Sequence, residues 1–128
     1  MDAIVRVQDR GGLWWQVLDQ GDREGNYLEE SASCMFAYAL AKGARQGHLP
    51  VEHRRLALRA YDAIVERFID TRADGAVDVT GCCVGTGLGG TPDRDGSFEY
   101  YAKRSVATND HHGVGAFVLA SVEIERAS

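Results

Sequence analysis

The chain has 128 residues, of which 45% are hydrophobic and 26% are charged, a balance typical of one modest globular domain. Its net charge of −5 argues against nucleic acid or an anionic membrane as a partner, since both require a basic surplus. There is no apolar run of the roughly 18 residues that a spanning helix needs. The N-terminus lacks the pattern of a secretory signal, so we expect a cytoplasmic protein.

The first part of the chain predicts little regular structure. Residues 2–8 have the character of a last helical turn, and residues 9–27 are a polar, glycine-rich loop around the apolar run LWWQVL. The three cysteines, two of them adjacent, form no C-x-x-C pair. This spacing predicts reduced thiols rather than a disulfide framework or a zinc site.

Helical periodicity begins near Leu28 and includes the run CMFAYALA at residues 34–41, which is apolar on nearly every side. Such a helix is usually buried on every side. We expect Gly47 to close it and Pro50 to precede a second helix at 51–69. This second helix is amphipathic, with one apolar stripe, and is therefore an outer helix.

Residues 70–108 carry no helical period. The run ADGAV predicts a turn and then a short strand, and SFEYYAK at 97–103 predicts another strand. A third helix, again nearly all apolar, is expected from about residue 110 to residue 126. The order of a buried helix, an amphipathic helix and another buried helix is typical of a double-layered helical toroid. These helices leave apolar surface that they cannot cover themselves, which predicts self-association.

Gly85, Gly87 and Gly90 have the spacing of a dinucleotide-binding turn, G-x-G-x-x-G. That motif requires a helix directly after the glycines, where the amides and the dipole hold the pyrophosphate. Here the residues TPDRDG follow, and they are typical of a turn. We therefore interpret the glycines as a loop whose backbone can come close to another group, and a dinucleotide site as the weakest hypothesis.

Five stretches together resemble the C-terminal third of the unsaturated rhamnogalacturonyl hydrolases, glycoside hydrolase family 105. They are GLWWQVLD (12–19), YLEESASCMFAYALAKG (27–43), GTGLGG (85–90), DGSFEYY (95–101) and NDHHGVGAFVLAS (109–121). The resemblance implies a mainly α fold in which residues 1–128 form a single domain. This domain would be a partial (α/α)6-barrel, or six-hairpin toroid, with a short β-hairpin in a long loop.

The resemblance also implies a chemistry. Family members hydrate the C4=C5 double bond of an unsaturated uronyl residue in pectin-derived oligosaccharides and release the sugar, with no metal and no cofactor. A carboxyl group protonates the alkene, and water adds to the neighbouring carbon. In family members, the aspartate that acts as this general acid lies before the C-terminal third that this chain resembles. The chain therefore has no counterpart of it. This predicts a truncated reading frame, a fragment or one piece of an assembly, and leaves enzymatic activity uncertain.

Eight residues are expected to contact the substrate: Trp14, Trp15, Gln16, Ser31, Gly85, Thr86, Gly87 and Tyr100. Tryptophan faces stack on sugar rings, although one tryptophan can instead pack over the barrel rim. Backbone amides of residues 82–87 are candidates to hold the uronate carboxylate, with a structural hairpin turn as the alternative. Glu29 is the one candidate catalytic carboxyl group, and capping of the helix after it is the alternative.

Two adjacent histidines, His111 and His112, do not predict a metal site, because neighbouring side chains usually diverge and no third ligand is spaced to join them. Asp110 is interpreted as the cap of the last helix, and Glu99 as an ion-paired residue. Two functions stay open. One is a carbohydrate-active hydrolase piece, completed by another polypeptide or by self-association. The other is a non-catalytic oligomerising remnant with at most weak sugar binding.

Overall fold

The structure of the protein is a computed structural model that describes residues 1–92 and 94–127. Its helices are α1 (Asp2–Arg6), α2 (Glu30–Arg45), α3 (His53–Phe68), α4 (Phe98–Ala102) and α5 (His111–Ala127). Two antiparallel strand pairs accompany them, β1 (Ile69–Thr71) with β2 (Val77–Val79), and β3 (Cys82–Cys83) with β4 (Val106–Ala107). The chain is mainly helical, as the sequence predicts, and within the described residues no helix is long and apolar enough to cross a bilayer.

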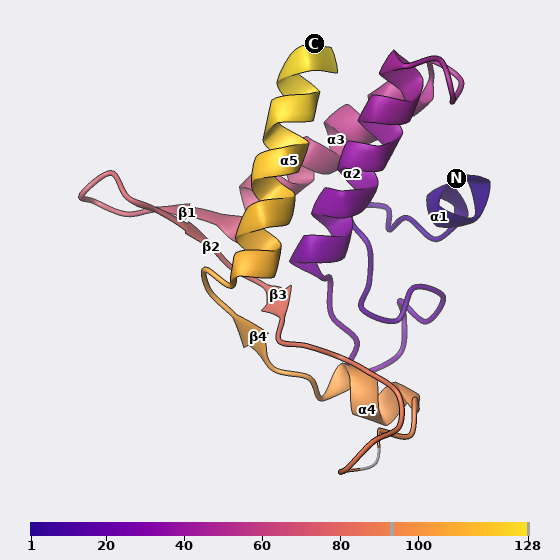
Figure 1. Ribbon diagram of the computed structural model, residues 1–128, viewed down its shortest axis with the longest axis vertical. Helices are drawn as coiled ribbons and strands as arrows, with labels where there is room; N and C mark the ends of the chain where they lie inside the picture. Colours follow the sequence, from indigo (N-terminus) through magenta and orange to yellow (C-terminus); the bar gives the residue numbers. More distant parts are fainter. Residues whose placement is uncertain (93, 128) are drawn as a thin grey trace.

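Helix α2 lies between α3 and α5 and packs against both of them. In Figure 1, α2 and α5 run side by side in the same direction, and both begin near β3. The core between the three helices is rich in alanine, for example Ala37, Ala60 and Ala120, all fully buried. Small side chains let helix axes approach closely, so the two inner helices hold their N-termini near each other.

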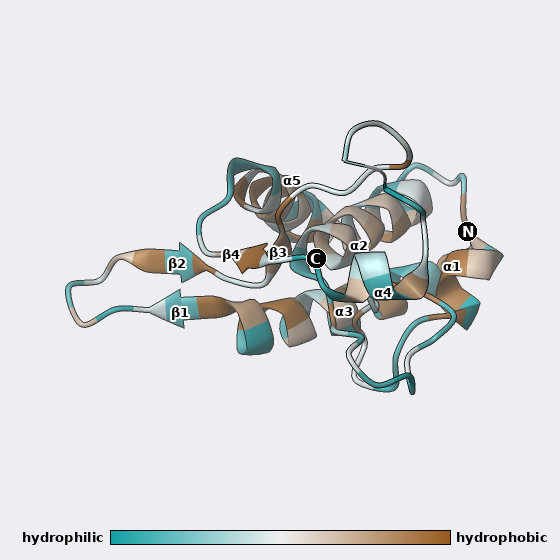
Figure 2. Cartoon of the chain, turned by 90° about the horizontal axis from the view of Figure 1, so that it is seen from below, coloured by the Kyte–Doolittle hydropathy of each residue, from teal (hydrophilic) through white to brown (hydrophobic). Residues whose placement is uncertain are grey.

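Part of the apolar surface stays uncovered. Met35 on α2 and Val118, Leu119 and Val122 on α5 are all exposed, Leu119 to 56%. Figure 2 shows the apolar residues of α5, β2 and β4 in brown. The expectation that these helices leave apolar surface that they cannot cover themselves is therefore confirmed. One face of the α2–α5 pair is exposed to solvent because no further helix covers it in the described residues.

An ion pair joins the far ends of the inner helices. The Arg45 guanidinium donates to both carboxylate oxygens of Glu123, at 2.5 and 3.1 Å. Glu123 is buried, and the hydrogen bonds from Arg45 hold the pKa of its carboxyl group below the ordinary value. The pair fixes α5 along α2 at the end opposite to β3.

The segments outside the long helices test the remaining predictions. The helical turn near residue 2 is confirmed, and so is the turn and strand at ADGAV. The strand predicted at residues 97–103 is wrong, because Ser97 caps a short helix there: its Oγ accepts from the Tyr100 N–H at 3.1 Å. The aromatic residues favoured a strand, but a local cap prevailed. The glycine motif is followed by a loop and then the five-residue α4, not by the helix of a dinucleotide site.

Candidate functional site

A cavity of about 330 Å³ lies where the N-termini of α2 and α5 meet the loop after β3. Its lining residues are Gln16, Glu29, Ser31, Ala32, Met35, Cys83, Gly85, Thr86 and His112. Four predicted contact residues, Gln16, Ser31, Gly85 and Thr86, thus come together with the candidate carboxyl group of Glu29. These residues come from three separate parts of the sequence, and only the packing of α2 against β3 brings them to one place.

Larger cavities lie elsewhere in the structure, but other residues line them. One of about 570 Å³ is formed by Val51, Glu52, Arg54, Arg55 and Leu58 near the start of α3. Another, of about 600 Å³, lies between Tyr27 and Arg104. Neither contains any of the predicted contact residues, so size alone does not identify the site.

Glu29 is the structural centre of the cavity wall. Its Oε2 accepts from the Ala32 N–H at 2.6 Å, which caps α2, and its Oε1 accepts from the Cys83 N–H at 2.8 Å. The Ser31 hydroxyl lies 3.0 Å from both oxygens. The capping role considered for Glu29 is confirmed. The same carboxyl group also ties α2 to β3, and only 2% of the residue is exposed.

The residue after Glu29 carries a second buried carboxyl group. Glu30 is fully buried, with Oε1 accepting from the Cys34 thiol at 3.0 Å, while Oε2 has no hydrogen-bond partner within residues 1–92 and 94–127. Burial raises the pKa of Glu30 above its ordinary value, which favours the neutral form. Gly113 of α5 lies directly against this side chain, in contact range of Glu30 and Cys82.

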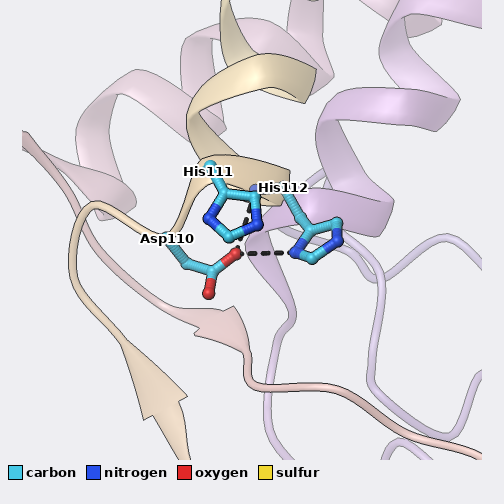
Figure 3. A group of neighbouring side chains, drawn as sticks. All are labelled: Asp110, His111 and His112. Carbon is cyan, nitrogen blue, oxygen red and sulfur yellow. Dashed lines mark hydrogen bonds and ion pairs between the residues drawn. The ribbon is translucent and has the colours of Figure 1, made fainter.

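His112 lines the cavity from the side of α5, and Asp110 and His111 are its neighbours in sequence. Asp110 Oδ1 accepts from the His112 N–H and lies 2.9 Å from His112 Nδ1 (Figure 3). The cap predicted for Asp110 is therefore present. These hydrogen bonds to His112 hold the pKa of Asp110 below its ordinary value, so the group stays ionised and can only accept. The Nδ1 atom of His112 must then carry the hydrogen of the 2.9 Å bond.

The argument that the adjacent histidines diverge is wrong. The ring centroids of His111 and His112 lie 4.5 Å apart with an angle of 32° between the ring planes, because both residues start the same helical turn. Asp110 offers a third possible ligand atom, and the three ligand atoms all lie within 4.8 Å of one another. Asp110 Oδ1 already serves as helix cap and partner of His112, which explains the cluster without an ion.

The Cys82 thiol is poorly suited to act as a nucleophile. Burial raises the pKa of the Cys82 thiol to about 11, so the thiolate that would attack a substrate is scarce near neutral pH. Cys83 contributes its backbone N–H to Glu29 and its sulfur to a 3.4 Å contact with the Gln16 amide. Cys83 therefore joins β3 to Glu29 and Gln16 at the cavity wall.

Four of the predicted contact residues lie outside the cavity. Trp14 is fully buried, and its indole N–H donates to the Ile4 carbonyl at 2.8 Å, so it is a core residue. The Trp15 ring covers Gly21. Gly87 lies under the Arg94 guanidinium, and Tyr100 packs edge-on against Tyr101 with ring centroids 5.0 Å apart. The ion pair predicted for Glu99 forms with Arg23 at 2.5 Å.

Three lining residues, Ala32, Met35 and His112, were not predicted. The signal for His112 was present in the sequence, because a side chain two residues after a helix cap lies in the first turn, where it can fold back onto the cap. Met35 lies one helical turn after Ser31 and therefore shares its face of α2.

Comparisons with known proteins agree with the fold. The family model described as Glycosyl Hydrolase Family 88 matches residues 1–128, so the chain belongs to this family of glycoside hydrolases. A solved structure of the C. acetobutylicum ATCC 824 glycoside hydrolase from family 105 is 44% identical to this chain, with a TM-score of 0.95. It is covered to 35% of its length, while 98% of the present chain is matched.

Two further relatives are a solved structure of lower sequence identity and a curated protein shorter than the solved structures. A possible member of the GH105 family from Klebsiella pneumoniae is 25% identical, with a TM-score of 0.78, over 98% of this chain and 29% of its own. Protein Atu3128 of Agrobacterium fabrum is 40% identical over 94% of this chain and 54% of its own. The chain thus spans about half of this curated relative and about a third of the solved structures. Its fold is a partial form of the six-hairpin fold of family 105.

Proposed function

We propose that the chain is the C-terminal, sugar-binding portion of an (α/α)6-barrel that hydrates the double bond of an unsaturated uronyl sugar. The observation that carries this proposal is the cavity at the paired N-termini of α2 and α5, where Gln16, Ser31 and Thr86 present polar groups. Membership of a glycoside hydrolase family makes a carbohydrate the expected ligand. We expect a cytoplasmic location, as predicted from the sequence.

The chain by itself is proposed to bind sugar without catalysing the reaction. A general acid needs a carboxyl group that can reach the alkene carbon of the substrate. Glu29 has both oxygens engaged within the protein and is almost fully buried. Asp110 is ionised and holds His112. This arrangement favours a binding wall over a complete catalytic centre.

The test uses the purified chain and an unsaturated rhamnogalacturonan disaccharide. We expect the disaccharide to bind in a calorimetric or NMR titration while the ultraviolet absorbance of the uronyl double bond stays constant. A fall in absorbance with turnover would show a complete catalyst and overturn the non-catalytic part of the proposal. A folded chain that does not bind the disaccharide would instead be a remnant that has lost sugar binding.

The exposed apolar face of α2 and α5 is proposed to be covered by a second copy or by the remainder of a longer barrel. We expect the chain alone to self-associate with rising concentration in sedimentation experiments, because this face exposes apolar side chains. Leu119→Lys should shift it toward the monomer. Val77→Lys is the matched control, since Val77 is exposed to 51% on the β1–β2 hairpin, away from this face. A folded chain that is monomeric at all concentrations contradicts the proposal.

A further inference from the structure

The cavity between α2 and α5 is unusual for a site expected to hold an anionic sugar. Among the described residues that line it, none is lysine or arginine, and the ionisable side chains are those of Glu29, Cys83 and His112. A carboxylate is usually held by a guanidinium, an ammonium or several free backbone amides. Two arginines that contact the chain around this loop, Arg94 and Arg104, donate to the carbonyls of Gly89 and Val84.

Several backbone amides of the cavity wall are also occupied. The N–H groups of Ala32 and Cys83 both donate to Glu29, at 2.6 and 2.8 Å. The N–H of Gly85 donates to the Cys83 carbonyl at 3.0 Å, and that of His112 donates to Asp110 at 2.9 Å. The positive end of α5, which could attract an anion, is already neutralised by its own cap. The carboxylate cradle expected from residues 82–87 therefore lacks free donors at these positions.

What the wall offers instead is hydrogen-bond acceptors and hydroxyl groups. Nδ1 of His112 carries a hydrogen, which it donates to Asp110. In the neutral ring the other nitrogen, Nε2, therefore presents a lone pair. The His112 side chain is 75% exposed at the cavity, which leaves this atom accessible. The hydroxyl of Thr86 and the side-chain oxygen of Gln16 complete a surface suited to sugar O–H groups, whereas a carboxylate has no hydrogen to donate to Nε2.

We propose that this cavity receives the neutral, hydroxyl-bearing sugar of the substrate, the leaving sugar, and that His112 accepts a hydrogen bond from one of its hydroxyls. The uronyl carboxylate is then held outside this cavity. Asp110 is a positioning residue, because it fixes the tautomer and the orientation of the imidazole without reaching the ligand. This inference rests on the proposed function, since it assumes that a sugar is the ligand.

The experiment compares two ligands that differ only at C6, galactose and galacturonate, by NMR titration of the full chain. We expect galactose to shift the resonances of Thr86 and the His112 ring and to bind at least about threefold more tightly than galacturonate, whose carboxylate meets no cation here. His112→Ala should weaken galactose binding by about three- to tenfold, the range for loss of one hydrogen bond. His111→Ala is the matched control, because the neighbouring ring does not line the cavity.

Further variants separate positioning from folding. Asn is as good a helix cap as Asp, so Asp110→Asn should leave the unfolding midpoint nearly unchanged while it broadens the His112 ring resonances and weakens galactose binding. His112→Gln should recover part of the affinity, since its amide oxygen is an acceptor. The inference is wrong if galacturonate binds more tightly in the cavity, or if the disaccharide binds and His112→Ala leaves its affinity unchanged. If neither the disaccharide nor galactose binds, the proposed function itself fails, and this inference fails with it.

Discussion

Replacing Gly113 with alanine is expected to destabilise the protein by about 2 kcal/mol, even though alanine is the better helix former. A Cβ atom at this position would collide with Glu30 Oε2 and lie 2.9 Å from Cys82 Cβ. Glu30 is fully buried and has no room to move away, so α5 would have to retreat from α2 and β3. The measurement is urea unfolding followed by circular dichroism.

The matched control lies two residues further along the same helix. Gly115 is exposed, and a Cβ there meets nothing within 4 Å. Gly115→Ala should therefore stabilise the protein by about 0.5–1 kcal/mol through helix propensity alone. Opposite signs for the two substitutions would establish that close approach, not backbone conformation, requires glycine at 113. Equal stabilisation by both would contradict the packing of α5 against Glu30.

Removing the Glu29 side chain is expected to cost about 2–4 kcal/mol of unfolding free energy in the variant Glu29→Ala. Two losses add up. Helix α2 loses its cap at the Ala32 N–H, and the Cys83 N–H is left without its acceptor. Urea unfolding gives the total, and hydrogen exchange of the Cys83 amide reports the second loss alone.

Glu29→Gln separates a structural role from a catalytic one. Its amide nitrogen must face either the Ala32 or the Cys83 N–H, so one of these two hydrogen bonds becomes a donor–donor contact. We expect this variant to lose roughly half as much stability as Glu29→Ala. Glu125→Ala, an exposed change on α5, is the control and should have little effect. If the unchanged chain showed turnover and Glu29→Gln abolished it with unchanged stability, Glu29 would be catalytic instead.

The long helices could be predicted because each is a local pattern. The expected second helix, 51–69, corresponds to α3 (His53–Phe68), and the third corresponds to α5 (His111–Ala127). Gly47 follows α2 with a φ of 75°, as a glycine after a helix end does. Short segments were less predictable, because a single cap such as Ser97 outweighs the preference of the aromatic residues after it.

The candidate site could be predicted only in part. Gln16, Ser31, Gly85 and Thr86 were expected and line one cavity, whereas Trp14 was expected at a sugar and lies in the core. A tryptophan in a polar loop has the same sequence signal in both cases. What differs is whether a neighbouring element covers it, and here Phe36 of α2 packs against its ring at 5.2 Å.

The sequence by itself determined the helices, the uncovered apolar surface and the resemblance to a glycoside hydrolase family, because these depend on residue types and spacing along the chain. The tertiary structure decided which polar groups remain free. Glu29 and the amides of residues 83 and 85 are polar in the sequence, yet each is paired inside the protein. His112 keeps an accessible ring nitrogen because Asp110 binds only the other one. Pairing between distant residues has no sequence signal of its own, since it depends on how α2, β3 and α5 pack together.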